Sequence, residues 1–130
     1  MKIYKPLLAG MVLPSVIFPF VSLFFYLNKG GSSLFFGFAP FIPLIWGIWN
    51  ILFINFVRVS PIIDREINIW IWGALLGFIL VSILSFFGLP KAIFNFSGFM
   101  SYGIFIIVPV VYGILWRYFV KYFNETLDLY

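Results

Sequence analysis

The sequence contains no cysteine and no histidine among its 130 residues. Without cysteine the chain can form no disulfide and no thiolate nucleophile, and without either residue it lacks the usual protein ligands of zinc and of haem iron. The commonest general base of enzymes is missing as well. We therefore expect no catalytic residue, no metal and no cofactor, and an enzyme is the class of function that the sequence favours least.

Charge is scarce too, because 9% of the residues are charged and 64% are hydrophobic. The charged residues stand in short clusters that separate four apolar stretches, residues 7–27, 34–57, 67–87 and 96–116. A helix needs about 20 apolar residues to cross a hydrocarbon core of roughly 30 Å, and each stretch is long enough. Barrel strands would be shorter and would alternate apolar with polar residues. The sequence thus predicts an all-α membrane protein, a four-helix transmembrane bundle in one integral membrane domain, residues 1–130, with a short polar cytoplasmic tail at 117–130.

The basic residues predict the orientation of the chain, since cytoplasmic loops carry an excess of lysine and arginine. With four spans, the N-terminus, the loop at 58–66 and the C-terminal segment share one side of the membrane. That side carries Lys2, Lys5, Arg58, Arg65, Arg117 and Lys121, and the other side carries Lys29 and Lys91. We predict a multi-pass protein of the inner (plasma) membrane with both termini in the cytoplasm. The net charge of +4 then reflects topology rather than nucleic-acid binding, because the basic residues form no patch.

The acidic residues all fall in the predicted cytoplasmic segments, at Asp64, Glu66, Glu125 and Asp128. The spans therefore hold no carboxylate that could relay protons or bind a cation within the membrane. This disfavours an ion-coupled carrier of the usual kind. In the loop at 58–66 opposite charges cluster, and we expect them to anchor helix ends at the headgroups, with the docking of a partner as the alternative.

Two pairs of segments indicate an internal duplication. Residues 43–48 (PLIWGI) in the second span resemble residues 109–114 (PVVYGI) in the fourth, and residues 22–29 resemble residues 85–91 at the ends of the first and third spans. Two such hairpins would be parallel repeats about an axis along the membrane normal, with the second and fourth helices facing each other. A chain with 19 phenylalanines also matches itself by chance, and both interpretations stay open.

Five prolines lie inside the predicted spans, at Pro14, Pro19, Pro40, Pro43 and Pro109. Each removes one helical hydrogen bond and leaves the carbonyl four residues earlier without its donor. The resulting kinks can line a substrate path. Proline is also common in membrane helices as a device of shape, and the structural role is the favoured interpretation.

The polar residues of the second and fourth spans predict a small pocket. An amide or phenol in hydrocarbon seeks a partner, so Asn50, Tyr102 and Tyr112 should face inward. We identify them as candidates for a polar pocket walled by Trp46 and Trp49. The alternative, which we favour slightly, is that Asn50 bonds a freed carbonyl on a neighbouring helix and only holds the bundle together.

Small residues predict a close contact between the third and fourth spans. Gly73 and Gly77 form a GxxxG pattern, which lets another helix backbone approach closely, and Ser97 and Ser101 offer a matching pair at the start of the fourth span. We expect these two faces to pack against each other within the bundle. A contact between two copies of the chain is the alternative.

The function favoured by these features is a non-catalytic accessory, structural or lipid-binding subunit of a larger membrane assembly. Its expected partners are membrane lipids and other membrane subunits or a second copy, with no nucleic acid. The alternative is a minimal oligomeric carrier or channel for a neutral or apolar solute that uses the pocket around Asn50. Such a carrier would need several copies, because four short helices rarely enclose a pathway.

Overall fold

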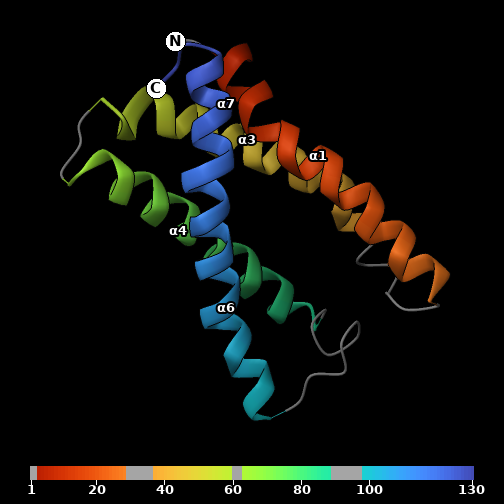
Figure 1. Ribbon diagram of the computed structural model, residues 1–130. Helices are drawn as coiled ribbons and strands as arrows, with labels where there is room; N and C mark the ends of the chain where they lie inside the picture. Colours follow the sequence, from red (N-terminus) through yellow and green to blue (C-terminus); the bar gives the residue numbers. More distant parts are fainter. Residues whose placement is uncertain (1–2, 29–36, 60–62, 89–97) are drawn as a thin grey trace.

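A computed structural model describes residues 3–28, 37–59, 63–88 and 98–130, and every regular element among them is helical (Figure 1). In chain order the elements are α1 (Tyr4–Leu27), the 3₁₀ turn η1 (Ala39–Phe41), α3 (Ile42–Leu52), the π-helical turn η2 (Phe53–Val57), α4 (Arg65–Phe86), α6 (Phe99–Leu115), the π-helical turn η3 (Trp116–Val120) and α7 (Lys121–Thr126). The predicted all-helical class is confirmed for this part of the chain.

Within the described segments, four helices are long and apolar enough to cross a membrane, Tyr4–Leu27, Ala39–Val57, Arg65–Phe86 and Tyr102–Thr126. The second is one continuous helix through η1, α3 and η2, and the fourth is continuous through α6, η3 and α7. The number of spans and the multi-pass class agree with the prediction. The fourth span, however, continues to Thr126, well beyond its predicted end at residue 116.

The segment predicted as a polar cytoplasmic tail, residues 117–130, continues the fourth helix and is helical as far as Thr126. Its charged and its buried residues each repeat every four positions, so they form two neighbouring stripes along one helix. The charged stripe is Arg117, Lys121 and Glu125, and the fully buried stripe is Trp116, Val120 and Asn124. After the helix ends, Leu129 turns back into the core and the Tyr130 ring stacks on Phe53, with 6.3 Å between ring centroids.

The helices pack as two hairpins, α1 along α3 and α4 along α6. Glycines bring the first pair together: a Cβ atom on Gly10 would lie 2.6 Å from the Trp46 carbonyl oxygen, and one on Gly47 would lie 2.7 Å from Leu7 Cδ1. Because no side chain intervenes at these points, the two backbones approach closely.

The second and fourth helices face each other through aromatic rings, as the duplication predicts. The ring centroid of Trp46 lies 5.1 Å from that of Tyr112 and 5.8 Å from that of Trp116. Trp46 and Tyr112 are equivalent positions in the two matching segments, and each of the two helices continues into a π-helical turn, η2 or η3. The duplication itself remains a prediction.

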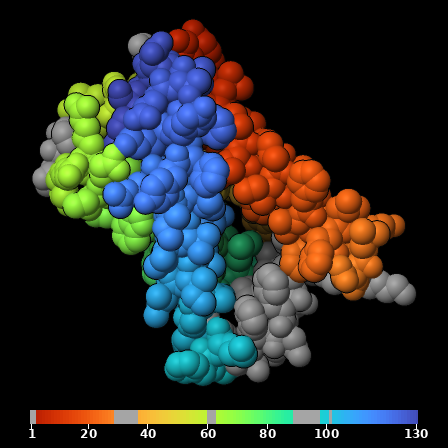
Figure 2. Space-filling model, viewed as in Figure 1, coloured from red at the N-terminus to blue at the C-terminus, as the bar shows by residue number. Residues whose placement is uncertain are grey.

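Packing is concentrated at the end of the bundle where both termini lie (Figure 1). The buried residues of α1 are Pro6, Ala9, Gly10 and Pro14, all in its first half. Away from the termini α1 and α6 diverge (Figures 1 and 2), and the second half of α1 runs beside the start of the second helix. In the first half of α6 the exposed residues include Phe99, of which 91% is accessible. We call these two diverging segments, residues 15–27 of α1 and 99–111 of α6, the open half.

Candidate functional site

Asn50 is the centre of a buried hydrogen-bonded knot that joins three helices. Its Nδ2 donates to the Pro6 carbonyl on α1 and to Asn124 Oδ1 on α7, each at 2.8 Å. Asn124 Nδ2 donates back to Asn50 Oδ1 at 3.0 Å, and both side chains are fully buried. Both N–H donors of the Asn50 amide and its oxygen are thus engaged by the protein itself.

Asn124, the side chain that pairs with Asn50, was not predicted from the sequence. It lies among charged residues after the predicted end of the fourth span. The signal that could have located it is the four-residue spacing that it shares with Trp116 and Val120. Its backbone carbonyl also accepts the Leu129 N–H at 2.7 Å, so the same residue closes the C-terminal turn.

The five residues of the predicted pocket do not come together as one group. Trp46 and Asn50 lie one turn apart on the buried face of α3, and Tyr112 contacts the Trp46 ring. Tyr102 is 73% exposed and lies in the open half. Trp49 points to α4 instead.

Trp49 forms a reciprocal clamp with Trp72 of α4. The rings stack with centroids 4.5 Å apart and an interplanar angle of 20°. Trp49 Nε1 donates to the Trp72 carbonyl at 3.0 Å, and Trp72 Nε1 donates to the Trp49 carbonyl at 3.2 Å. Because α3 and α4 belong to different hairpins, the clamp joins the two halves of the chain.

Two other indoles lie in the core between the hairpins. Trp46 Nε1 and Trp116 Nε1 are buried and form no hydrogen bond of normal geometry with any described residue. An indole N–H usually finds a partner when it is buried.

The glycine pair of α4 packs on the fourth helix, in a register different from the predicted one. A Cβ atom on Gly77 would lie 2.8 Å from Tyr112 Cβ and 3.0 Å from Pro109 Cα, and one on Gly73 would overlap Trp116. Antiparallel pairing places these glycines against residues 109–116, whereas the start of the fourth span lies at its far end. Ser97 and the side chain of Ser101 lie outside the described residues.

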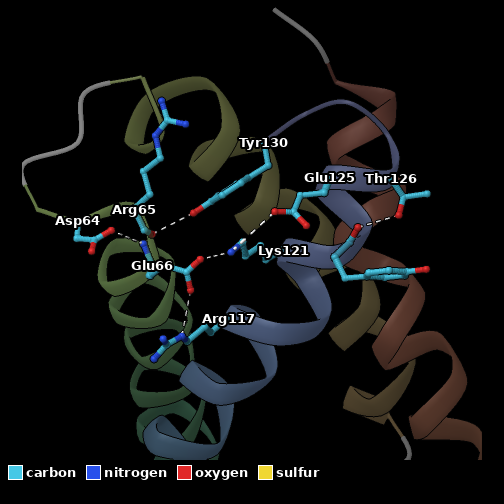
Figure 3. A network of polar contacts seen from close by, with 9 residues as sticks. Asp64, Arg65, Glu66, Arg117, Lys121, Glu125, Thr126 and Tyr130 are labelled. Atoms are coloured by element: carbon cyan, nitrogen blue, oxygen red, sulfur yellow. Dashed lines mark hydrogen bonds and ion pairs between the residues drawn. The ribbon is translucent and has the colours of Figure 1, made fainter.

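Charges from two helices meet beside the knot (Figure 3). Glu66, at the start of α4, pairs with Arg117 Nε at 3.2 Å and with Lys121 Nζ, and Lys121 also lies 3.8 Å from Glu125. The Asp64 side chain caps α4 by accepting the Glu66 N–H at 3.2 Å. These partly exposed pairs link the start of α4 to η3 and α7, and such pairs each contribute little to stability.

The Tyr130 phenol ties the C-terminal turn to the same region by donating to the Arg65 carbonyl at 3.1 Å (Figure 3). Burial raises the pKa of this phenol above its ordinary value. The phenol therefore keeps the proton that it donates over a wider pH range.

The prolines divide into two structural classes. Pro14 and Pro19 lie inside α1, and Pro109 lies inside α6. Pro40 and Pro43 instead stand in the first turns of η1 and α3, where helices tolerate proline. Three of the five, at 19, 40 and 43, line a groove of about 470 Å³ between the open half of α1 and the start of the second helix.

Comparison of the chain with models of protein families, with curated proteins and with solved structures finds no significant match.

Proposed function

We propose that this chain is a non-catalytic membrane subunit, closed at the end that carries its termini and open to lipids or partner helices at the other. The proposal rests on the unequal distribution of hydrogen bonds, stacked rings and ion pairs between the two ends of the bundle. The buried amide knot, the tryptophan clamp and the charges around Glu66 all lie toward the closed end. The open half exposes large apolar side chains.

The exposed side chains of the open half fit an interface within the membrane. Phe20, Phe24 and Leu27 on α1, and Ile106 and Ile107 on α6, are each more than half accessible. Inside a bilayer such a surface contacts lipid chains or other helices, and helices associate there by close van der Waals packing. We therefore infer that the subunit joins a larger assembly, or a second copy, through this half.

The hydrogen bonds of the Asn50 amide favour a structural subunit over a solute carrier. A solute pocket needs polar groups that a ligand can reach, and the Asn50 amide already bonds to Pro6 and Asn124. The buried knot favours a structural part for the residue.

We expect a cysteine placed at Phe20 to crosslink in native membranes to one discrete partner, either another protein or a second copy. Phe20 lies in the open half and is 70% exposed, and the natural chain has no cysteine that would compete. The matched control is Phe56→Cys, at another phenylalanine, 58% exposed, in η2 near the closed end. Mass analysis of the products checks the expectation. Equal yields at both positions, or flux of a small solute through vesicles holding the purified chain alone, would contradict the proposed function.

We also propose that both termini lie in the cytoplasm of the cell, on the basis of the lysine and arginine bias. The described residues include four candidate spans, and a chain that crosses a membrane four times has both termini on one side. Reporter fusions after Asn28 and after Tyr130 should therefore report opposite compartments, and a fusion after Asp64 should agree with Tyr130. A cytoplasmic signal from the fusion after Asn28 would contradict the proposed orientation.

A further inference from the structure

One cation of the charged group around Glu66 has donors to spare. Arg117 donates from Nε to Glu66 Oε2 at 3.2 Å, and its side chain stays 42% exposed. The four N–H donors on the two terminal nitrogens of its guanidinium bond to no described residue. We call the surface around it, formed by Glu66 and Trp70 of α4 with Gly113 and Arg117 of the fourth helix, the arginine flank.

The Arg117 guanidinium is held in a fixed direction. Its Nε–H bonds Glu66, and its central carbon lies 5.6 Å from the centre of the Tyr118 ring, within the range of a cation–π contact. In Figure 3 the terminal nitrogens point away from Lys121 and across α4. A guanidinium that is fixed at Nε and unpaired at its fork is suited to bind a phosphate or carboxylate through two parallel hydrogen bonds.

The Glu66 carboxylate does not cancel the positive charge of this flank. Lys121 Nζ bonds to one of its oxygens and Arg117 Nε to the other, so two cations meet a single anion. Glu125 lies 3.8 Å from Lys121 and two turns from Arg117 along the helix. One positive charge is therefore left over at the exposed guanidinium.

The position of the flank along the membrane normal places it among lipid headgroups. Glu66 is the second residue of α4, and this helix of 22 residues is about 33 Å long. A hydrocarbon core is about 30 Å thick, so the first turn of α4 lies at the headgroups when the helix spans the core. Anionic headgroups are the negative charges concentrated at that depth.

Farther from the termini the flank becomes apolar. Trp70 is half-buried over Gly113, and a Cβ atom on that glycine would lie 2.8 Å from the indole Nε1. The next residue of each helix, Ile71 or Ile114, is 42% or 45% exposed. Tryptophan and aliphatic side chains below an arginine follow the order of a phospholipid, whose charged phosphate stands above apolar chains.

We propose that the arginine flank binds the headgroup phosphate of an anionic phospholipid, in the leaflet on the side of the termini. The two terminal nitrogens of Arg117 donate to the phosphate oxygens, and the acyl chains lie along Ile71 and Ile114. The proposal rests on the membrane insertion that the proposed function assumes. It adds a ligand at the closed end and requires no contact through the open half.

Lipid binding to the purified chain tests the proposal. The chain is delipidated in detergent, phosphatidylglycerol or phosphatidylcholine is added, and the retained lipids are counted by native mass spectrometry. We expect the first phosphatidylglycerol to bind about tenfold more tightly, because the choline cation of the other lipid competes with arginine for the phosphate. Equal affinity for the two lipids would overturn the proposal, and displacement by an equal concentration of inorganic phosphate would overturn it in favour of a free anion.

Three substitutions separate the guanidinium from its surroundings. Arg117→Gln removes the fork and should weaken phosphatidylglycerol binding about tenfold. Arg58→Gln, just after η2, makes the same change of charge at the same end of the bundle and should leave the affinity nearly unchanged. Glu66→Gln removes the ion pair and keeps the fork, so its affinity should equal or exceed that of the natural chain. A loss in either control as large as that in Arg117→Gln would reject the site.

A photoreactive benzoylphenylalanine in place of Ile114 locates the ligand in native membranes. We expect adducts with anionic phospholipids above their share of the membrane lipids. Adducts in proportion to that share, or one discrete protein adduct, would overturn the proposal, the latter in favour of a partner that docks on the flank. If Arg117→Gln fails to fold, this adduct and the lipid selectivity of the natural chain decide. The crosslink at Phe20→Cys reports on the open half, so either result can fail without the other.

Discussion

Replacing Asn50 with leucine is expected to lower the free energy of unfolding by about 1–3 kcal/mol, the cost of leaving a buried polar partner without its bond. The substitution removes the hydrogen bonds to Pro6 and Asn124 and leaves the Asn124 amide buried among apolar groups. Average hydrogen bonds between membrane helices contribute less, roughly 0.6 kcal/mol, because the unfolded chain also finds partners in the membrane. Asn50 exceeds that average because its amide takes part in three bonds.

Replacing Asn124 together with Asn50 tests whether the loss comes from an unpaired amide. When both members of a buried polar pair become apolar, the loss is smaller than when one remains. The double variant Asn50→Leu/Asn124→Leu should therefore be more stable than Asn50→Leu alone, as measured by unfolding in mixed detergent micelles. Asn28→Leu is the control, since the Asn28 side chain is exposed and bonds only within its own turn, to the Phe24 carbonyl. Additive losses in the double variant would show that the two amides act independently.

Introducing isoleucine at Gly73 is expected to destabilise the bundle by roughly 1–3 kcal/mol or to separate α4 from the fourth helix, as overpacked cores do. Any Cβ atom at this position overlaps the Trp116 side chain, which is fully buried and cannot move into solvent. Gly77→Ile should behave alike, because its nearest neighbours include the Pro109 backbone.

Gly103 is the matched control for these two glycines. It lies on α6 in the open half, and a Cβ atom there would meet nothing within 4 Å. Gly103→Ile should leave the unfolding free energy of the isolated chain nearly unchanged. If instead Gly73→Ile is tolerated in the monomer and only prevents association, the glycine face is an interface between copies.

The predictions for Asn50 and Gly73 concern the closed end of the bundle. The open half is held together by fewer contacts of these kinds. At the closed end, helices distant in sequence share buried amides, stacked indoles and glycine contacts. In the open half, α1 and the second helix line a groove that contains three proline residues. Substitutions of exposed residues there should affect binding more than folding.

The spans were predictable to the extent that they depend on local properties. Apolar length and scarcity of charge located the first and third helices, and the end of the second, within three residues of the observed ends, and the predicted start of the second at residue 34 lies outside the described residues. The same reasoning placed the end of the fourth helix too early, because it took Arg117 as the start of a polar tail. Whether a charge ends a span depends on the face of the helix that carries it, and Arg117 lies on the face that meets Glu66.

The prediction of a pocket shows that helical periodicity alone does not decide which side chains face the core. Helical periodicity correctly predicted that Asn50 faces protein, since an amide in hydrocarbon needs a partner. It also placed Tyr102 and Tyr112 on one stripe of the fourth span. A stripe faces the core only where its helix is packed, and α6 diverges from the bundle between these two tyrosines.

By itself the sequence determined that this chain forms four apolar helices long enough to cross a membrane, because the length of an apolar run is a property of neighbouring residues. Only the tertiary structure decided which polar groups are paired and which half of the bundle is open. Asn50 and Asn124 are 74 positions apart. Their contact depends on the close approach of helices at Gly10, Gly47 and Gly73, which no local pattern of residues specifies.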